Sequence, residues 1–494
     1  MIFDLKTKTI EHTASFPTKS AFVIFIKNSE ELEGIIKSKK LNVSSLQIKN
    51  FNEDENSELR IWNSENPNLV FIKKSKVSEK TNVDYFRNYL SGLIPGLEKN
   101  NIRNLFIEIA RFDDYLEIFS EKKYYYQSII EGVLLGNYNF NKYKTEKQKR
   151  KILSVNFITK DKKVFNSAKK SAENIIDGVY FTRDLVNEPA NTLTPFEFVK
   201  RVKSEFRNSN VKVKSFNEKE LQKRNMNAIL SVGMASSNKP HLIIAHYRPK
   251  GKITKKIALV GKGVTYDTGG LSIKPTSGML DMKADMAGGA AVFGIIKAAS
   301  QNNIPIEIIG IVPAVENSIS GNAFKPGDII STSSGKTIEV KDTDAEGRIV
   351  LADALEYASK LKPDEIIDFA TLTGAVVVSL GLYTAGIFTK NDKMNDELLK
   401  ASQITYELAW RLPFWDEYNK LLKSKIADIS NLGSRWGGAI TGGKFLEYFV
   451  DENIPWTHID IAGPTLQHDL SNYTKNYCTG YGVRLIFNYL EQQY

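Results

Sequence analysis

The sequence predicts an α/β protein with a smaller amino-terminal domain and a larger domain built on a mostly parallel sheet covered by helices. The chain has 494 residues, of which 42% are hydrophobic and 25% charged, as in ordinary globular proteins of more than one domain. In its second half, short apolar runs alternate with longer helix-like segments, which is typical of a parallel sheet with helices on its faces. Ligands of such sheets gather at the carboxyl ends of the strands.

The first half predicts a compact α/β domain over residues 1–164. Apolar runs at 21–26 and 70–72 alternate with connections rich in Lys, Asn and Glu, and residues 128–135 are a helical candidate. A helix is expected over about 166–187, where Ala168, Ala172, Ile175 and Val179 have close to helical spacing and prolines follow. We place this connecting helix at the start of the second domain, residues 165–494.

The second domain contains four expected strands and two expected helices. The strands are residues 256–260, 305–312, 365–370 and 457–461, and the helices are 287–299 and 347–361. Small residues at 287–291 would let the first of these helices approach the sheet closely.

Two charged stretches stand out among apolar and glycine-rich neighbours. They are residues 261–285, with Lys262, Asp267, Lys274 and Asp285, and residues 342–348, with Asp344, Glu346 and Arg348. Burying four carboxylates without partners would cost several kcal/mol each, on the order of the penalty for any unpaired buried charge. Two divalent metal ions would balance them, and ordinary salt bridges are the alternative.

The residue types limit the chemistry of such a site. None of the five histidines lies in either stretch, so oxygen ligands would dominate, and Mg²⁺, Mn²⁺ and Zn²⁺ all stay open. Asp344 and Glu346 are two apart, so an extended segment would project both to one side, with Arg348 following.

The two lysines have different expected roles beside divalent ions. Lys262 either points away or is deprotonated and becomes a ligand, whereas Lys274 could stay charged and stabilise an oxyanion. Peptide hydrolysis and phosphoester hydrolysis are both compatible with these residues.

Charge and cysteine content bear on partners and location. The net charge is +10, and the densest basic run is residues 142–151, which we interpret as a solvated face rather than a phosphate-binding patch. The single cysteine, Cys478, suits a reducing compartment. No stretch approaches the roughly 20 apolar residues of a membrane span, so we expect a cytoplasmic protein.

The charged stretches resemble the signatures of the leucyl aminopeptidase family, the two-metal cytosolic aminopeptidases. The resemblance covers essentially residues 180–494, with the strongest segments at 260–275, 282–286 and 343–348, and others at 183–187, 458–463 and 479–484. It is thinner in the first half.

The resemblance implies a ligand set and a role for each site residue. One metal would be held by Lys262, Asp267, Asp285 and Glu346, and the other by Asp267, Asp344 and Glu346. In the family, which uses Zn²⁺ or Mn²⁺ with Mg²⁺ or Co²⁺ as alternatives, a bridging water or hydroxide attacks the scissile carbonyl. The residue matching Lys274 stabilises the oxyanion, and the one matching Arg348 holds a bicarbonate as general base.

The same resemblance implies a substrate, a fold and an assembly. Substrates would be peptides with a free amino terminus, whose first side chain enters a pocket formed by Met282, Thr371, Gly374 and Ala462. The implied architecture is a macro-like amino-terminal domain and a catalytic domain with a central mixed sheet, assembled as a homohexamer.

Some features leave other functions and properties open. The alternatives are a DNA-binding or architectural role through the basic surface, and phosphoesterase activity at the same metals. Asp342 stands where the family usually has Asn, which places another carboxyl group beside the site. Side-chain preference and the native metal pair are not determined by the sequence.

Overall fold

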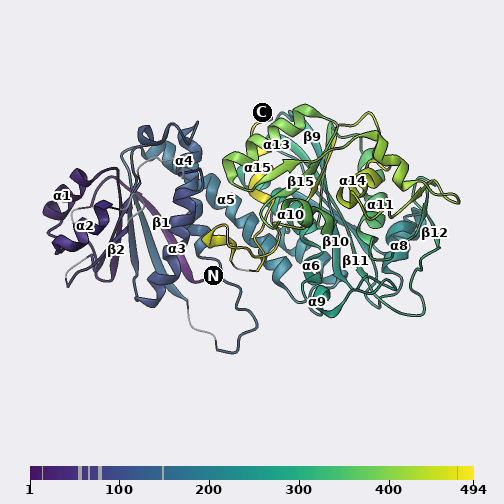
Figure 1. Cartoon of the computed structure of the whole chain (residues 1–494), viewed down its shortest axis with the longest axis horizontal. Helices are drawn as coiled ribbons and strands as arrows, with labels where there is room; N and C mark the ends of the chain where they lie inside the picture. The colour runs from purple at the N-terminus through teal and green to yellow at the C-terminus, as the bar shows by residue number, and fades with distance from the viewer. Residues whose placement is uncertain (14, 54–57, 65–66, 76–80, 147–149, 476) are drawn as a thin grey trace. The chain divides into compact units, whose positions relative to one another are not determined.

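The computed structural model describes the whole chain except residues 14, 54–57, 65–66, 76–80, 147–149 and 476 (Figure 1). The described residues form two compact units. The first comprises Met1–Glu173 with Ser471–Tyr473, and the second comprises Asn174–Leu470 with Thr474–Tyr494. Helix α5 (Lys162–Asn187) contributes residues to both units and contains the predicted helix at 166–187. The predicted α/β class is confirmed in both units.

The first unit is an α/β domain. Among its described residues, six strands form one sheet in the order β1-β6-β5-β2-β4-β3, and all neighbours are parallel except the edge strand β3. The inner strand β2 is buried along its whole length, as expected for a parallel strand covered on both faces. The strands are β1 (Phe3–Ile10), β2 (Ser20–Ile26), β3 (Glu58–Trp62), β4 (Leu69–Lys74), β5 (Asn104–Glu108) and β6 (Lys151–Ile158). The helices are α1 (Ser29–Ser38), α2 (Ser45–Glu53), α3 (Tyr85–Lys99), a 3₁₀ helix (Phe112–Tyr115) and α4 (Lys122–Gly136).

The second unit contains a mixed sheet of nine strands within the described residues. Its order is β16-β15-β18-β14-β9-β11-β8-β7, with β10 also paired to β11. The central strands β18, β14, β9 and β11 are parallel, whereas β15, β8 and β7 introduce antiparallel pairs. These strands are β7 (Val211–Phe216), β8 (His241–Tyr247), β9 (Lys255–Gly261), β10 (Gly263–Asp267), β11 (Ile306–Asn317), β14 (Glu365–Ala370), β15 (Ala385–Phe388), β16 (Ala409–Arg411) and β18 (Trp456–Asp460).

Helices and a small sheet complete the second unit. The helices are α6 (Pro195–Glu205), α7 (Glu218–Lys223), α8 (Asn227–Gly233), α9 (Thr276–Met279), α10 (Ala287–Asn302), α11 (Glu346–Lys360), α12 (Gly374–Leu380), α13 (Asp392–Thr405), α14 (Gly438–Glu447) and α15 (Val483–Glu491). Strands β12 (Ile329–Ser331), β13 (Thr337–Glu339) and β17 (Ile429–Ser430) form the small sheet, and 3₁₀ helices lie at Met282–Ala284 and Asp416–Leu422. A further 3₁₀ helix, Asn472–Thr474, has its first two residues in the first unit.

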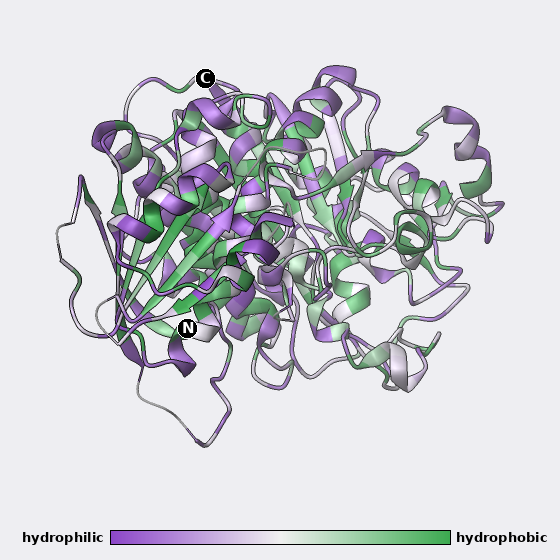
Figure 2. Ribbon diagram, turned by 60° about the vertical axis from the view of Figure 1, so that its left-hand side comes forward, coloured by the Kyte–Doolittle hydropathy of each residue, from purple (hydrophilic) through white to green (hydrophobic). Residues whose placement is uncertain are grey.

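Two helices cover opposite faces of the central strands. Helix α11 packs into the apolar core that includes Val260 and Ile311, whereas a side chain added at Gly310 would meet Ile296 and Val292 of α10. A Cβ at Gly288 would lie 2.1 Å from the carbonyl oxygen of Phe369. The small residues of α10 therefore permit the close approach to the sheet that the sequence predicted. Figure 2 shows the apolar strands between helices whose outer faces are hydrophilic.

Most predicted elements of the second half are confirmed, with small differences at their ends. The four predicted strands correspond to β9, β11, β14 and β18, and the two predicted helices to α10 and α11. In the first half, α4 begins at Lys122, earlier than the predicted helix at 128–135, because Tyr124–Tyr126 are buried within it. Among the described residues, no helix is both long enough and apolar enough to span a membrane.

Candidate functional site

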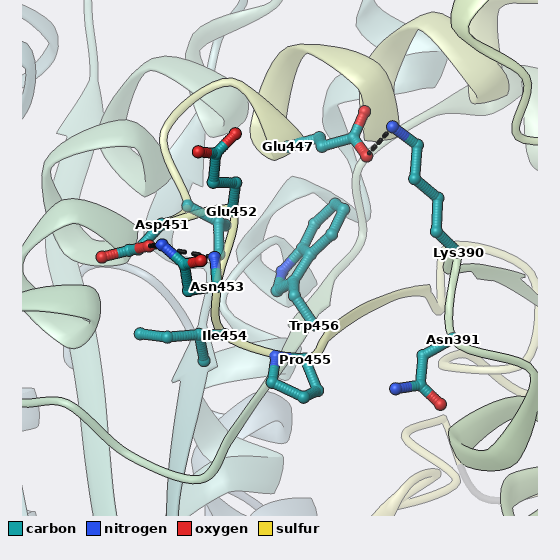
Figure 3. Close-up of a pocket in the computed structure, with 10 residues that line it drawn as sticks. Lys390, Asn391, Glu447, Asp451, Glu452, Asn453, Ile454, Pro455 and Trp456 are labelled. Carbon is teal, nitrogen blue, oxygen red and sulfur yellow. Dashed lines mark hydrogen bonds and ion pairs between the residues drawn. The ribbon is translucent and has the colours of Figure 1, made fainter.

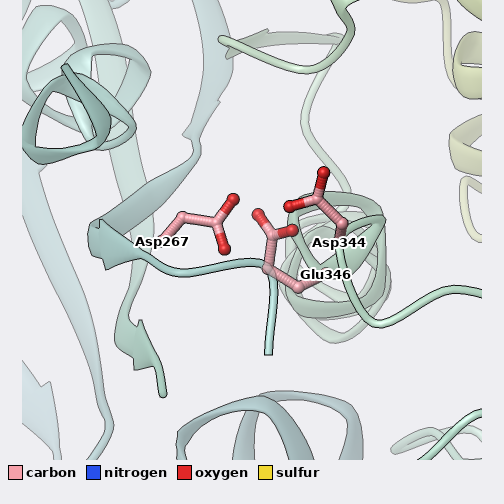
Figure 4. Close-up of side chains that lie close together, drawn as sticks. All are labelled: Asp267, Asp344 and Glu346. Atoms are coloured by element: carbon pink, nitrogen blue, oxygen red, sulfur yellow. The ribbon is translucent and has the colours of Figure 1, made fainter. Parts of the chain in front are cut away.

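Three carboxylates meet at the carboxyl ends of the central strands. Asp267 is the last residue of β10, Asp344 lies in the turn before α11, and Glu346 is the first residue of that helix. Each offers an oxygen, and the three oxygens lie within 4.8 Å of one another (Figure 4). Parallel pairing of β10 with β11 places the end of both strands at this edge of the sheet.

Two lysines cross-link these carboxylates and Asp285. Lys262 follows β9, and its Nζ lies 2.8 Å from Oδ1 of Asp285 and 2.8 Å from Oε1 of Glu346. Lys274 Nζ lies 2.9 Å from Oδ2 of Asp267 and also pairs with Asp344. The structure therefore brings together the six charged residues Lys262, Asp267, Lys274, Asp285, Asp344 and Glu346.

Glycine at position 347 makes room for Lys262. A Cβ at Gly347 would lie 2.3 Å from Cε and 2.6 Å from Nζ of that lysine, which is closer than nonbonded atoms approach. On its other side, the ammonium donates to the carbonyl oxygen of Thr371 at 3.2 Å, and the Thr371 hydroxyl donates to Oδ1 of Asp285 at 2.8 Å. Lys262 is thus held between the first residues of α11 and Thr371, the first residue after β14.

Burial and mutual repulsion raise the pKa values of the clustered carboxyl groups, so the cluster would be stabilised by additional positive charge. Burial, and then repulsion from Asp267, raise the pKa of Asp344 to about 7 and also raise the pKa of Glu346. Burial raises the pKa of Asp285 as well, against the attraction of Lys262. Burial opposes the charged form of Lys262, but the surrounding carboxylates outweigh it and raise the pKa of the ammonium.

The donor set fits divalent metal ions better than lysine pairing alone. Oδ2 of Asp285 and Oε2 of Glu346 are buried and accept no hydrogen bond from any described residue. Buried carboxylate oxygens without partners are costly, and convergent carboxylate oxygens are ligands that divalent cations accept. The salt-bridge alternative accounts for only part of the cluster, because it leaves these oxygens without a partner.

A buried asparagine that the sequence did not single out supports Asp267. Asn317 ends β11, and its Nδ2 donates to Oδ1 of Asp267 at 2.8 Å and to the carbonyl oxygen of Thr343 at 3.0 Å. The backbone N–H of Gly269 donates to the same Oδ1 at 2.8 Å. These bonds fix the rotamer of Asp267 and tie it to the segment that carries Asp344. The only signal in the sequence was a polar residue at a strand end.

Arg348 lies in the first turn of α11, two residues after Glu346. Its Nη1 donates to the carbonyl oxygen of Asn431 at 2.8 Å, and its buried Nε has no acceptor among the described residues. Burial lowers the pKa of Arg348 to about 10, against the opposing attraction of Glu346. The condition of an extended segment is not met, because Glu346 and Arg348 are helical, and the helix predicted from residue 347 contains Arg348. Asp344 reaches the cluster from a turn in which its N–H donates to Oδ1 of Asp342 at 2.8 Å.

A cavity of about 440 Å³ opens beside the carboxylates. All four predicted pocket residues, Met282, Thr371, Gly374 and Ala462, line it, together with Lys262, Asp267, Lys274, Asp285 and Asp344. Arg348 is not part of the lining. The buried Asp460, also missed from the sequence, positions the wall by accepting bonds from the backbone N–H of Leu372 at 3.1 Å and of Ala462 at 3.2 Å.

Two further features lie outside this constellation. His458 is fully buried in β18, where its Nδ1 lies 2.6 Å from Oδ1 of Asp368. A second cavity of about 420 Å³ lies at the amino end of β18, beside Trp456 and the ion pair of Lys390 with Glu447 (Figure 3). None of the predicted site residues lines it.

Comparison with known proteins gives consistent matches over the whole chain. Residues 180–487 match the family model described as "Cytosol aminopeptidase family, catalytic domain". A probable cytosol aminopeptidase of Sulfurihydrogenibium sp. is 39% identical and covers 99% of this chain and 98% of its own. A second one, of Chloroherpeton thalassium, is 40% identical over 89% of each chain.

Solved structures agree in fold over nearly the same length. A mutant of tomato leucine aminopeptidase matches with a TM-score of 0.84 and 30% identity, over 99% of this chain and 97% of its own. The bottromycin maturation enzyme BotP in complex with Mn matches with a TM-score of 0.83 and 27% identity, over 96% of this chain and 99% of its own.

Proposed function

The chain belongs to the cytosol aminopeptidase family and is an aminopeptidase, and from this premise we propose that it removes amino-terminal residues from peptides at the carboxylate cluster. The observation that carries the proposal is the convergence of Asp267, Asp344 and Glu346 within 4.8 Å, beside a cavity. A cluster with partnerless buried oxygens next to a cavity is the arrangement that metal-assisted hydrolysis needs.

Two divalent ions per subunit, Zn²⁺ or Mn²⁺ with Mg²⁺ or Co²⁺ as alternatives, complete the proposed site. Lys262, Asp267, Asp285 and Glu346 would hold one ion, and Asp267, Asp344 and Glu346 the other. Such ions polarise a peptide carbonyl and activate water at neutral pH. The Mn complex of BotP supports Mn²⁺ among these ions. Lys262 would serve as a neutral ligand, because an ammonium beside a cation is repelled.

We assign the remaining charged groups to stabilising and holding anions. Lys274 lines the cavity and, unlike Lys262, is not a proposed ligand, so its ammonium can donate to the oxyanion that develops on the scissile carbonyl. Arg348 has a buried N–H without an acceptor among the described residues, which favours an anion beside it. Bicarbonate, acting as general base, is the proposed anion.

The cavity is proposed to select a free amino terminus and one side chain. The free α-amine of a peptide, in its neutral form, would be a ligand for a bound metal ion, as the family resemblance implies, so chain ends are favoured over internal peptide bonds. Gly374 has no atom within 4 Å of an added Cβ and Ala462 is small, so the wall leaves space for the first side chain.

The test is hydrolysis of a panel of aminoacyl amides by the purified protein, with and without a chelator and with Zn²⁺ or Mn²⁺ restored. We expect the chelator to abolish the activity and added metal to restore it. The Asp285→Ala variant should lose both the activity and the metal at one site. Asp353→Ala is the matched control, since Asp353 is a buried carboxylate outside the cluster. Turnover of a phosphomonoester with aminoacyl amides untouched would replace the proposal with phosphoesterase activity.

Location, assembly and nucleic-acid binding are separate proposals. The relatives' names support a cytosolic location, and the resemblance supports a homohexamer, which light scattering after size-exclusion chromatography would test.

Of the basic run 142–151, residues 147–149 lie outside the described residues. Lys151 donates to Asn101 at 3.4 Å and Arg150 lies 4.0 Å from Asp4, so these two cations have partners in their own unit. A flat salt dependence of DNA binding would exclude the architectural role.

A further inference from the structure

An exposed arginine and tryptophan stand on a short loop of the second unit, residues 432–437, which we call the rim loop. Trp436 is 75% exposed, and the guanidinium of Arg435 lies 5.4 Å from the centre of its ring. Ser434 Oγ donates to the carbonyl oxygen of Trp436 at 3.1 Å. Exposing a whole indole to water is unfavourable, and Trp and Arg are the residues that most often anchor binding partners.

The rim loop is attached to the candidate site at both ends. Before it, the fully buried Asn431 accepts from Arg348 at 2.8 Å and donates to the carbonyl oxygen of Asp342 at 2.6 Å. After it, a Cβ at Gly438 would lie 3.1 Å from Cβ of Ala375, the neighbour of the cavity residue Gly374. The loop therefore runs from the backbone that Arg348 contacts to helix α12, whose first residue, Gly374, lines the cavity.

The exposed surface continues beyond Trp436. Trp415 is 64% exposed and stacks on Tyr418 with ring centres 6.5 Å apart. The Tyr418 ring in turn lies 3.4 Å from a Cβ at Gly437, the last residue of the rim loop. An aromatic surface with one guanidinium thus lies on a loop whose two flanking residues contact segments of the site, and none of residues 432–437 lines the cavity that would take the first residue.

We propose that the rim loop binds the residues of the substrate that follow the first one, with Trp436 against an apolar side chain and Arg435 on the terminal carboxylate. This inference rests on the proposed function. A peptide whose first residue fills the cavity must leave the site along its rim, and a flat indole complements aromatic side chains while a guanidinium complements a carboxylate. The preferred substrates are therefore short peptides with an apolar second or third residue and a free carboxyl end.

The experiment compares substrates that share one amino-terminal residue and differ beyond it. They are the anilide, a tripeptide ending in two phenylalanines and a tripeptide ending in two glycines, each tripeptide with a free and an amidated carboxyl end. The variants are Trp436→Ala and Arg435→Gln. Trp410→Ala in β16 is the control, because Trp410 is 62% exposed and lines neither the cavity nor the rim loop.

Each variant should lose activity on its own class of substrate. We expect Trp436→Ala to lower kcat/KM about fivefold on the phenylalanine peptides through a higher KM, and much less on the glycine peptides. Arg435→Gln should lower kcat/KM about tenfold on free peptides and little on amidated ones. Trp410→Ala should resemble the wild type.

Two results separate failure of this inference from failure of the function. Equal losses on the anilide and on every peptide, or no loss on any of them, would overturn the role of the rim loop while the aminopeptidase stands. A metal-loaded wild type that releases an amino-terminal residue from none of the substrates would overturn the proposed function and this inference with it.

Discussion

Asn317 offers a direct test of whether the carboxylate cluster is a metal site or a set of salt bridges. Its Nδ2 donates to Asp267 at 2.8 Å and to the carbonyl oxygen of Thr343 at 3.0 Å, and both bonds are lost in Asn317→Ala. A buried bond to a carboxylate contributes about 2 kcal/mol to stability and a bond to a carbonyl about 1 kcal/mol. The free energy of unfolding should therefore fall by about 3 kcal/mol.

The same substitution should weaken metal binding if Asp267 is a ligand. Residues that orient a metal ligand typically change metal affinity by about 10- to 100-fold when they are removed. Such a change equals about 1.4 to 2.8 kcal/mol, which matches the bond that Asp267 would lose. Metal per chain would be measured by mass spectrometry after equilibration with Zn²⁺ or Mn²⁺ buffered by a competing chelator, and stability by denaturant unfolding of the metal-free protein.

A second buried asparagine separates the two effects. Asn395 in α13 is also buried, and its Nδ2 donates to Asp396 at 3.0 Å, away from the cluster. Asn395→Ala should lower stability and leave the metal affinity unchanged. If Asn317→Ala lost the expected stability but bound both ions as tightly as the wild type, Asp267 would not be a ligand and the reasoning would be refuted.

Three further predictions follow from particular side chains. Lys274→Ala and Arg348→Ala should each lower kcat by at least about 100-fold with metal content unchanged, because neither is a proposed ligand. Removing an oxyanion donor typically costs that much for Lys274, and losing a general base costs about as much for Arg348. Metal loss in either variant would contradict these roles. Burial raises the pKa of Asp353 to about 7, whereas an unfolded carboxyl titrates near pH 4, so its contribution to the free energy of unfolding should decrease as the pH rises from about 4 to 7. Denaturant titrations should show that part of the pH dependence missing from Asp353→Asn, and an identical pH dependence would contradict the assignment. Burial raises the pKa of the Cys478 thiol to about 11, so iodoacetamide at pH 8 should leave it unmodified until the protein unfolds, and rapid native labelling would show it accessible.

The charged residues of the site could be predicted from the sequence because they lie in two contiguous stretches that each follow or precede a regular element. Asn317 and Asn431 could not, because neither lies in a segment that the sequence singled out, and Asp460 lies in the resembling segment 458–463 without a role that the sequence assigns to it. Their roles depend on which strands pair, as when β10 and β11 bring Asp267 opposite Asn317. The α/β class and the strands could be predicted from the apolar periodicity. The position of the Asp344 carboxylate in the cluster depends on a turn that spacing alone does not reveal. The domain boundary at 164/165 stays a prediction.

Neutral hydrogen bonds explain how carboxylates that repel one another are held together. The hydroxyl of Thr343 donates to the carbonyl oxygen of Gly269 at 2.7 Å and accepts from the N–H of Ser272 at 2.8 Å, while the N–H of Thr343 donates to the Ser272 hydroxyl at 3.2 Å. Gly269 permits this pairing, since its φ of +85° suits glycine and an added Cβ would lie 2.5 Å from the Ser272 carbonyl oxygen. The loop after Asp267 and the segment before Asp344 are therefore joined by uncharged groups, so their carboxylates stay close whether or not a cation is present. Burial, and then repulsion from Asp267 at this short range, raise the pKa of Asp344, and a divalent cation is the ligand that would relieve the repulsion.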